Sequence, residues 1–308
     1  MIGERSSEST LAHTAKTRNL KTEHRVQKFW FSLMWLFGLI TVLILILVIG
    51  YVLVQGGKAV NWELLTTPPK GGLSGEGGIS TTIATTFYLV GLTLLIATPL
   101  GVSAAVYLIE YAGEQSLSSK FLRTMINIAN FAVETLAGIP SIIFGLFGYV
   151  LFVSTLKFGF SLLSASLAGA CLVLPTIIRT TEEALLAVPD DYRRGSLALG
   201  ATKWQTLSRI VLPAAMPGII TGIILSVGRV ISETAVFYVT LGGSYRLPTS
   251  IMDSGRTLAL HLYYLAMDTR AFDKAMGTGA VLVVMIFLIN LVINLISRKL
   301  TAGVRKVR

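Results

Sequence analysis

The sequence has few charged residues and few residues that could hold a metal ion. Asp, Glu, Lys and Arg make up only 14% of its 308 residues, whereas a soluble domain carries about 25%. The single cysteine, Cys171, excludes an internal disulfide and a thiolate metal cluster. The three histidines, His13, His24 and His261, are far apart in the sequence, so we expect no metal site. The scarcity of charge excludes a disordered chain, a coiled coil and an ordinary soluble enzyme.

Long apolar runs are abundant instead. Hydrophobic residues make up 53% of the chain, and the mean hydropathy is +0.71. Six runs approach or exceed the roughly 20 residues that cross a bilayer core: Phe31–Val54, Thr82–Ile109, Thr124–Leu156, Leu162–Ile178, Ala214–Leu241 and Met276–Ile296. The first is longer than the apolar core of about 7–15 residues in a secretory signal, so we expect an uncleaved span. The sequence therefore predicts an all-α integral membrane protein with six transmembrane helices.

The third run, residues 124–156, has an awkward length of 33 residues. As one helix it would be about 50 Å long, against a hydrocarbon core of about 30 Å. Two spans would need about 40 residues and a turn. We therefore predict one long helix that bends near Pro140 or projects beyond the bilayer.

The distribution of basic residues sets the expected topology. With six spans and both termini inside, 18 of the 26 Lys and Arg residues lie on the inner side, 7 lie on the outer side, and Arg229 lies within a span. Seven spans would move the loop after the fourth run and the C-terminal tail outside, against the positive-inside rule. The net charge of +10 therefore indicates membrane topology rather than nucleic acid binding.

The inner loop between the fourth and fifth runs carries helix start and stop signals. Pro189 and Asp190 are typical of the start of a short helix. Gly200 suits the C-terminal end, where a left-handed backbone is needed. We expect Pro213 and Pro217 to close the segment before the next span. The pattern predicts two short helices with a sharp corner at Gly200.

The second of these helices has its own start signal. Thr202 and Gln205 have the spacing of a capping box. Trp204, Leu207 and Val211 recur at helical spacing, which predicts one shared face. A structured loop of this kind indicates either a docking element or an interfacial helix lying on the lipid, and the residues alone leave both open.

The same loop resembles that of a known family. Gly200, followed by nine residues and then by Ile210-Val211-Leu212-Pro213, is similar to the second half of the EAA loop of binding-protein-dependent ABC importer permeases. The Glu-Ala-Ala positions of that pattern are Arg194, Gly195 and Ser196 in this sequence. The resemblance therefore lacks the acidic residue of the ATPase contact. We expect Asp190, Asp191, Arg193 or Arg194 to make a different ion pair with the partner.

Further motifs resemble the phosphate-specific permeases of this family. They run in family order from about residue 80 to 300: Pro99-Leu100-Gly101-Val102 with Tyr107-Leu108-Ile109-Glu110-Tyr111, Leu136 to Leu146, Pro213 to Gly222, and Arg229 with Ser232-Glu233-Thr234-Ala235. The stretch Phe272-Asp273-Lys274-Ala275 and the span after it look like the A-type rather than the C-type permease subunit.

The resemblance implies a type I ABC importer permease in a bacterial inner membrane. It implies a cytoplasmic tail at 1–30, a first helix at 31–54, a permease domain at 80–300 with a coupling loop at 182–213, and a cytoplasmic tail at 301–308. The expected partners are a C-type permease subunit, two ATP-binding subunits and an extracytoplasmic phosphate-binding protein. ATPase coupling would fall to residues of the loop: Asp190, Asp191, Tyr192, Arg193, Arg194, Gly200, Ala201, Thr202, Trp204 and Gln205.

No phosphate-cradling G-x-x-x-x-G-K-[ST] motif occurs in the sequence. This chain is therefore not expected to bind ATP by such a loop or to carry a cofactor. ATP and magnesium would bind to partner subunits, or the energy would come from an ion gradient.

Two charged residues fall within the fifth run. Arg229 at mid-bilayer would cost on the order of 3 kcal/mol, and Glu233 follows one helical turn later, so both are expected on one helix face. We interpret the pair as lining the substrate path, with Arg229 meeting phosphate and Glu233 compensating it; the alternative is a structural pair between two permeases. Glu134 is a further acid that either lines the path or lies near the inner end of its helix.

Three other functions are consistent with a membrane protein of this kind. The substrate could be another oxyanion, because the binding protein would set most of the selectivity. An ion-coupled secondary anion carrier is a different class, but no repeat between the two halves supports it and it leaves the Gly200 loop unexplained. A membrane-embedded enzyme has no metal-ligand cluster or catalytic triad to support it.

Overall fold

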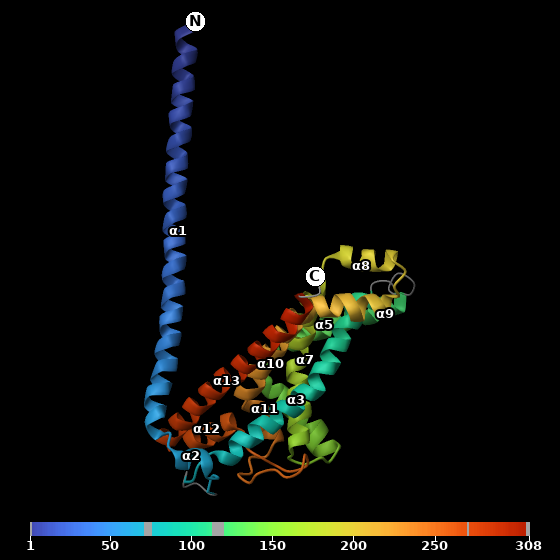
Figure 1. Ribbon diagram of the computed structural model, residues 1–308. Helices are drawn as coiled ribbons and strands as arrows, with labels where there is room; N and C mark the ends of the chain where they lie inside the picture. Colours follow the sequence, from blue (N-terminus) through green and yellow to red (C-terminus); the bar gives the residue numbers. More distant parts are fainter. Residues whose placement is uncertain (1, 71–75, 113–119, 270, 306–308) are drawn as a thin grey trace. The chain divides into compact units, whose positions relative to one another are not determined.

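The computed structural model describes residues 2–70, 76–112, 120–269 and 271–305, which form helices joined by loops (Figure 1). The chain divides into two compact units, Met1–Val54 and Gln55–Arg308. The elements are α1 (Ile2–Ala59), α2 (Trp62–Thr66), α3 (Ser80–Val106), η1 (Tyr107–Tyr111), α5 (Lys120–Ala137), α6 (Ser141–Gly148), η2 (Tyr149–Thr155), α7 (Leu162–Leu186), α8 (Asp190–Ala198), α9 (Lys203–Thr206), η3 (Leu207–Val211), α10 (Leu212–Ser232), α11 (Ala235–Thr240), α12 (Leu258–Met267) and α13 (Phe272–Arg305). The elements labelled η are π-helical turns. In these ranges, β-pairing is limited to isolated bridges.

The first unit is formed by helix α1. The helix begins at Ile2, so the segment predicted as a tail, residues 1–30, continues the first helix. No proline precedes Pro68 in the sequence to interrupt it. The stretch Val26–Ala59 is long and apolar enough to cross a membrane, as predicted for the first span.

The second unit is a bundle in which α3 and α10 pack on α7. Small residues allow these helices to approach closely. A Cβ atom on Gly101 of α3 would lie 2.7 Å from Cγ2 of Ile177 on α7, and one on Gly222 of α10 would lie 2.7 Å from Cβ of Thr180. The small residues Ala165, Ala168 and Gly169 on α7 are buried, as close helix packing requires.

The number of possible spans agrees with the prediction of six. Among the described residues, five helices are long and apolar enough to cross a membrane, and a sixth span results if the segments Arg123–Ala137 and Ser141–Thr155 are counted together. These two segments meet at an angle of 110°. The predicted bend near Pro140 is therefore correct in place, but it separates two helices. Pro140 (φ −57°, ψ 139°) is the N-cap residue of α6. Helix α5 ends before it at Ala137, because a proline lacks the N–H of the helical hydrogen bond and disfavours helix at the preceding residue.

The fifth apolar run differs from its prediction at both ends. Helix α10 ends at Ser232, and the separate helix α11 follows, so Ala214–Leu241 is not one helix. At its start, the helical stretch Lys203–Ser232 is continuous. Pro213 therefore does not close the segment, nor does Pro217. The π-helical turn η3 directly before Pro213 has wider hydrogen bonding, which accommodates a residue without an N–H group.

Two further helix boundaries differ from the predictions. The fourth span continues to Leu186 as α7, so the loop predicted at 182–213 begins within this helix. The sixth span is lengthened to Phe272–Arg305; the predicted tail at 301–308 is therefore helical to Arg305, and residues 306–308 lie outside the described residues. Helix α12 was not predicted, although Leu258, Leu260 and Leu265 on it are buried. It lies at the end of the bundle opposite α8 (Figure 1).

Candidate functional site

The loop between α7 and α10 contains the predicted first short helix, α8, but the predicted second one, α9, continues through η3 into α10 and is therefore the start of a long helix. Helix α8 begins directly after Pro189, and the acidic residues Asp190 and Asp191 occupy its first turn. Their negative charges interact favourably with the positive end of the helix dipole there. Gly200 has φ +83°, a left-handed conformation that suits glycine. The chain turns there and enters α9, so the predicted corner at Gly200 is confirmed.

Hydrogen bonds fix this corner from both sides. The Gln205 backbone N–H donates to Thr202 Oγ1 at 3.2 Å, and the Thr202 N–H donates to Gln205 Oε1 at 2.9 Å. These bonds form the predicted capping box. The buried hydroxyls of Ser196 on α8 and Thr206 on α9 lie 2.9 Å apart. The two short helices are therefore joined by side-chain contacts as well as by the chain.

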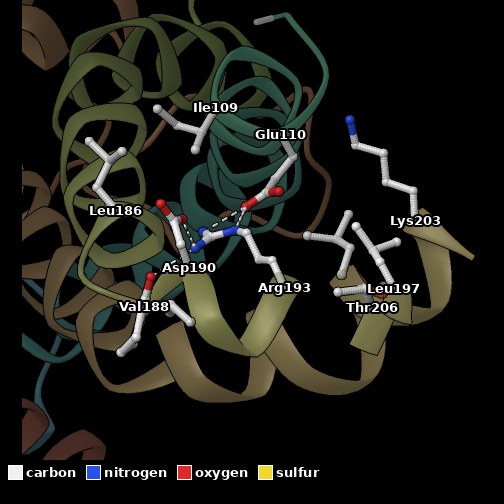
Figure 2. Close-up of a pocket in the computed structure, with 11 residues that line it drawn as sticks. Ile109, Glu110, Leu186, Val188, Asp190, Arg193, Leu197, Lys203 and Thr206 are labelled. Atoms are coloured by element: carbon white, nitrogen blue, oxygen red, sulfur yellow. Dashed lines mark hydrogen bonds and ion pairs between the residues drawn. The ribbon is translucent and has the colours of Figure 1, made fainter. Parts of the chain in front are cut away.

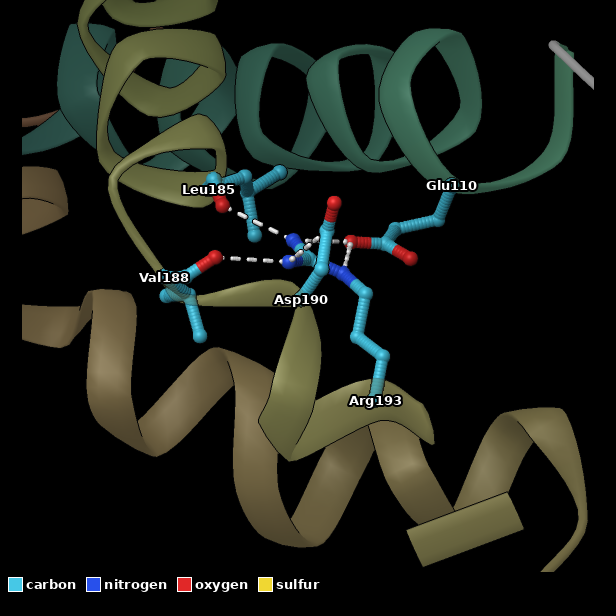
Figure 3. Close-up of polar contacts among 5 residues, drawn as sticks. All are labelled: Glu110, Leu185, Val188, Asp190 and Arg193. Carbon is cyan, nitrogen blue, oxygen red and sulfur yellow. Dashed lines mark hydrogen bonds and ion pairs between the residues drawn. The ribbon is translucent and has the colours of Figure 1, made fainter. Parts of the chain in front are cut away.

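Arg193 anchors α8 to the membrane-spanning bundle (Figure 3). Its Nη2 and Nε donate to Glu110 Oε1 on η1 at 2.8 and 3.1 Å. The same guanidinium donates to the carbonyls of Leu185 and Val188, both at 2.8 Å, at the C-terminal end of α7. It also contacts Asp190 Oδ1 at 3.2 Å. The side chains of Arg193 and Glu110 are 18% and 10% exposed, so this ion pair is largely shielded from water.

This geometry changes the expected role of Arg193. A guanidinium has five N–H donors, and Arg193 uses them on partners within the chain. Arg193 therefore positions the loop. Glu110 was not among the predicted site residues, because a separation of 83 residues along the chain gives no sign of the contact. The only signal was an acidic residue at the end of an apolar span.

A pocket of about 710 Å³ lies between η1 and the loop (Figure 2). Its lining combines the Arg193–Glu110 pair with apolar side chains: Ile109, Leu186, Val188, Leu197 and Leu207. At its edge, Lys203 Nζ lies 4.9 Å from the ring centroid of Tyr111, within range of a cation–π contact. The loop is therefore held to the bundle at defined points, with a hollow between them.

The outer surface of the loop exposes large side chains. Trp204 is 64% exposed and Leu199 is 91% exposed. Trp204 does not share the buried face of Leu207 and Val211, so that prediction is wrong. Trp204 lies in the first turn after the corner at Gly200, ahead of the π-helical turn that carries Leu207 and Val211. Exposed apolar groups on a structured loop are typical of an interaction surface.

The remaining loop residues divide by their contacts. Asp191, Tyr192 and Arg194 are exposed on α8, and Ala201 is half-buried beside the corner. Among the charged side chains of α8, Asp190 and Arg193 pair with each other. Asp191 and Arg194 are exposed and form no ion pair with the described residues.

The structure does not bring Arg229 and Glu233 together as predicted. Arg229 is exposed on α10, but the helix ends at Ser232 and Glu233 has an extended backbone (φ −73°, ψ 130°). Glu233 Oε1 accepts a hydrogen bond from the Val236 N–H at 3.3 Å, which caps the start of α11. Within the described ranges, no ion pair joins the two residues. The expected shared helix face is wrong because the helix breaks between them.

Glu134 belongs to a charged cluster between α5 and α7. Its Oε2 lies 3.8 Å from Arg179 Nη2, and Arg179 Nη1 lies 3.1 Å from Glu182 Oε2. Arg179 also donates to the Asn130 carbonyl at 3.4 Å. The Glu182 side chain is 8% exposed, whereas that of Glu134 is 78% exposed. Arg179 thus compensates the buried Glu182 and links α7 to α5.

Comparison with known proteins agrees with this architecture. Residues 98–306 match the family described as the binding-protein-dependent transport system inner membrane component. The probable ABC transporter permease protein YqgI of Bacillus subtilis (strain 168) is 33% identical over 291 residues, covering 87% of this chain and 96% of that protein. The phosphate transport system permease protein PstA 1 of Mycobacterium tuberculosis (strain CDC 1551 / Oshkosh) is 36% identical over 218 residues, covering 70% of this chain and 69% of that protein.

A solved structure shows the same fold. A chain in the crystal structure of a bacterial alginate ABC transporter, in complex with an alginate pentasaccharide-bound periplasmic protein, aligns with a TM-score of 0.63. The alignment covers 85% of this chain and 93% of that chain at 17% identity. The predicted all-α fold of a type I ABC importer permease is thereby confirmed. The chain is a multi-pass membrane protein that belongs to the binding-protein-dependent transport system inner membrane component family.

Proposed function

We propose that this chain is the permease subunit of an ATP-driven phosphate importer. It forms half of the translocation pathway and couples it to a separate ATPase through the loop predicted at residues 182–213, which in the structure is the segment of α8 and α9 between α7 and η3. The observation that carries this proposal is the α8–α9 loop, which is fixed to the bundle by Arg193 and Glu110 and exposes Trp204 on its outer surface. The relative named as a phosphate transport system permease protein supports phosphate as the substrate.

The proposed assembly has four kinds of subunit. This chain pairs with a C-type permease subunit, two ATP-binding subunits dock on the α8 side, and a phosphate-binding protein docks on the opposite side. ATP and magnesium bind to the ATPase subunits. Both termini of this chain are cytoplasmic, a placement supported by the 18 basic residues on the inner side against 7 on the outer side.

The contacts within α8 narrow the ion pair with the ATPase. Asp190 and Arg193 already pair with each other, and Arg193 also pairs with Glu110. Arg194 is exposed and occupies the position of the family's glutamate. We therefore assign Arg194 to an acidic residue of the ATPase, with Asp191 as the second charged contact. Because Arg194 is positive where the family pattern has a negative residue, the ATPase surface that contacts it should carry the opposite charge to the usual one.

Two alternative functions are another oxyanion as the substrate and an ion-coupled secondary carrier. Another oxyanion keeps the same assembly, and uptake of labelled phosphate in competition with sulfate or molybdate distinguishes it. An ion-coupled secondary carrier does not account for the family match over residues 98–306 or for the exposed surface of the loop.

Co-purification tests the proposed assembly. The tagged chain, isolated from its native membrane, should retain an ATPase and a second permease subunit. Arg194→Glu should lower the retained ATPase by about tenfold, because like charges across an interface repel. Arg209→Glu is the matched control, because Arg209 is exposed on η3 outside α8. Absence of an ATPase from the wild-type sample contradicts the proposed function, whereas an unchanged Arg194→Glu complex contradicts only the assigned ion pair.

A further inference from the structure

A second polar pocket lies at the end of the bundle opposite α8. Its volume is about 490 Å³. It is formed by the loop after α11 and by helix α12, and its lining is rich in hydroxyl groups and backbone: Gly242, Gly243, Ser244, Tyr245, Ser254, Arg256, Tyr264, Asp268 and Thr269. Among the described residues of this lining, Arg256 is the basic one.

Arg256 is held in one orientation by three neighbours. Its Nε donates to the Gly243 carbonyl at 2.9 Å, and its Nη1 lies 3.4 Å from His261 Nδ1. Its guanidinium carbon lies 4.2 Å from the ring centroid of Tyr264, a cation–π contact. These contacts use one edge and one face of the guanidinium. Within the described part of the chain, Nη2 has no hydrogen-bond partner.

The charge of Arg256 is half-buried without a direct ion pair among the described residues. Asp268 also lines the pocket and acts on Arg256 through its charge, but no ion pair joins the two side chains in this part of the chain. Burial lowers the pKa of Arg256, although an arginine side chain stays protonated. A partly buried cation without a direct ion pair is unfavourable, and an anion that contacts the guanidinium in the pocket would relieve this cost. The planar fork of a guanidinium matches the oxygens of phosphate.

The backbone around Arg256 is fixed before any ligand binds. Gly242 and Gly243 have φ of +94° and +87°, and Gly243 N–H donates to Gly255 O at 3.0 Å. A Cβ atom on Gly243 would lie 2.9 Å from the Tyr264 hydroxyl, so glycine is needed for the close approach of this ring. Ser254 Oγ donates to Leu241 O at 2.7 Å. The loop thus presents Arg256 on a preorganised support, which lowers the entropic cost of binding.

We propose that this pocket is an oxyanion subsite in which the free Nη2 edge of Arg256 binds phosphate before it reaches the membrane-spanning path. The choice of phosphate rests on the proposed function; the anionic class of the ligand rests on Arg256 itself. Hydroxyl groups of Ser244 and Tyr245 on the same lining complete the polar surroundings.

Asp268 gives the subsite a preference. Phosphate near neutral pH carries a proton that can be donated to a carboxylate, whereas sulfate carries none. Asp268 therefore accepts a hydrogen bond from phosphate and repels sulfate. The repulsion between Asp268 and any anion also keeps the binding weak, as a site of passage requires.

Protection of Arg256 from an arginine-specific dicarbonyl reagent tests the subsite. The full chain is purified in detergent, treated with phenylglyoxal at increasing inorganic phosphate, and analysed by peptide mass spectrometry. Phosphate at about ten times its dissociation constant should slow modification of Arg256 about tenfold. Arg246 is the matched control, because it is exposed in the same loop and does not line the pocket, and its rate should not change.

Sulfate and one variant complete the experiment. Sulfate should protect Arg256 less than phosphate does, and Asp268→Asn should increase protection by sulfate and remove the difference. Equal slowing at Arg256 and Arg246, no slowing at Arg256, or no reaction of Arg256 without phosphate would overturn the subsite. Equal protection by the two anions in the wild-type chain would overturn the role of Asp268. A result that overturns the subsite does not overturn the proposed function. Phosphate uptake by the assembled transporter tests the proposed function separately.

Discussion

Arg193 Nη2 lies 2.8 Å from Glu110 Oε1, so α8 is tied directly to the π-helical turn that ends the second predicted span. The same guanidinium binds the carbonyls at the end of α7. A displacement of α8 therefore acts on α3 and α7 together, and these two helices pack against each other in the bundle. This contact gives the coupling loop a mechanical connection to two membrane-spanning helices.

Removing one member of this pair should uncouple the loop. Arg193→Ala leaves Glu110 buried without its counter-charge, and loss of one partner of a buried ion pair costs about 3 kcal/mol or more. Glu110→Gln should have a similar effect, and the double variant should cost less than the sum of the two. We expect a lower midpoint of thermal unfolding in detergent. In the assembled transporter, ATP hydrolysis should persist while phosphate uptake is lost.

Asp190→Ala provides the control for this experiment. Its side chain is 75% exposed, and an exposed ion pair contributes less than about 1 kcal/mol. A loss of stability or uptake in Asp190→Ala as large as that in Arg193→Ala would contradict the anchoring role.

Gly200 and Gly195 test the corner of the loop. Neither glycine has another group within 4 Å of an added Cβ atom, so the two substitutions differ only in backbone conformation. Gly200→Ala should destabilise the chain by about 1 kcal/mol because Gly200 has φ +83°. Gly195→Ala should stabilise α8 by up to about 1 kcal/mol because alanine favours helix. Thermal unfolding of the two variants should shift in opposite directions, and equal shifts would show that the corner is not strained by a side chain.

Arg229 and Glu233 should differ in their effects on transport. Arg229→Ala should lower phosphate uptake tenfold or more, since a charged hydrogen bond contributes about 1.5–3 kcal/mol. Glu233→Gln keeps the oxygen that caps α11 and should assemble normally, whereas Glu233→Ala loses a cap worth about 1 kcal/mol. Uptake of labelled phosphate is measured with assembly checked by co-purification. Wild-type uptake by Arg229→Ala in an intact complex would contradict its role in the path.

His261 should make the stability of the chain depend on pH. Burial, followed by the positive charges of Arg256 and Lys274, lowers the pKa of His261 to about 4, while its unfolded value is about 6.5. Between these two pH values the unfolded chain binds more protons than the folded chain, so the free energy of unfolding rises with pH. The stabilising contribution of the neutral, buried His261 is fully present above about pH 6.5. Acidification to pH 4 should remove about 3 kcal/mol.

The matched variant for this prediction is His261→Asn, which keeps a polar group near Nδ1 without a proton that titrates in this range. Thermal unfolding in detergent between pH 7.5 and 4.5 should decline less steeply in this variant than in the wild-type chain. Parallel curves for the two proteins would show that His261 does not carry the pH dependence.

Local signals explain the features that the sequence predicted well. The capping box of Thr202 and Gln205 and the left-handed Gly200 depend on neighbouring residues, and apolar runs of sufficient length identify helices in a membrane protein. The position of the bend near Pro140 follows from the missing N–H group of proline.

The features that were not predicted have no local sequence signal. Glu110 meets Arg193 because two helix ends converge, and no local pattern encodes this. The break after Ser232 occurs without a proline or glycine, so the helical spacing of Arg229 and Glu233 was misleading. Trp204 is exposed although it lies three residues before the buried Leu207, so helical spacing alone did not predict which face is covered. Helix α12 is 10 residues long, too short to register as a span.

Reconstituted uptake tests the central proposal most directly. The chain is placed in proteoliposomes with its C-type partner, the two ATPase subunits and the phosphate-binding protein, and entry of labelled phosphate is followed with and without ATP. We expect uptake that requires ATP and the ATPase subunits, and that is lost in Arg193→Ala while ATP hydrolysis continues. Phosphate uptake without ATP or without an ATPase subunit would contradict the account.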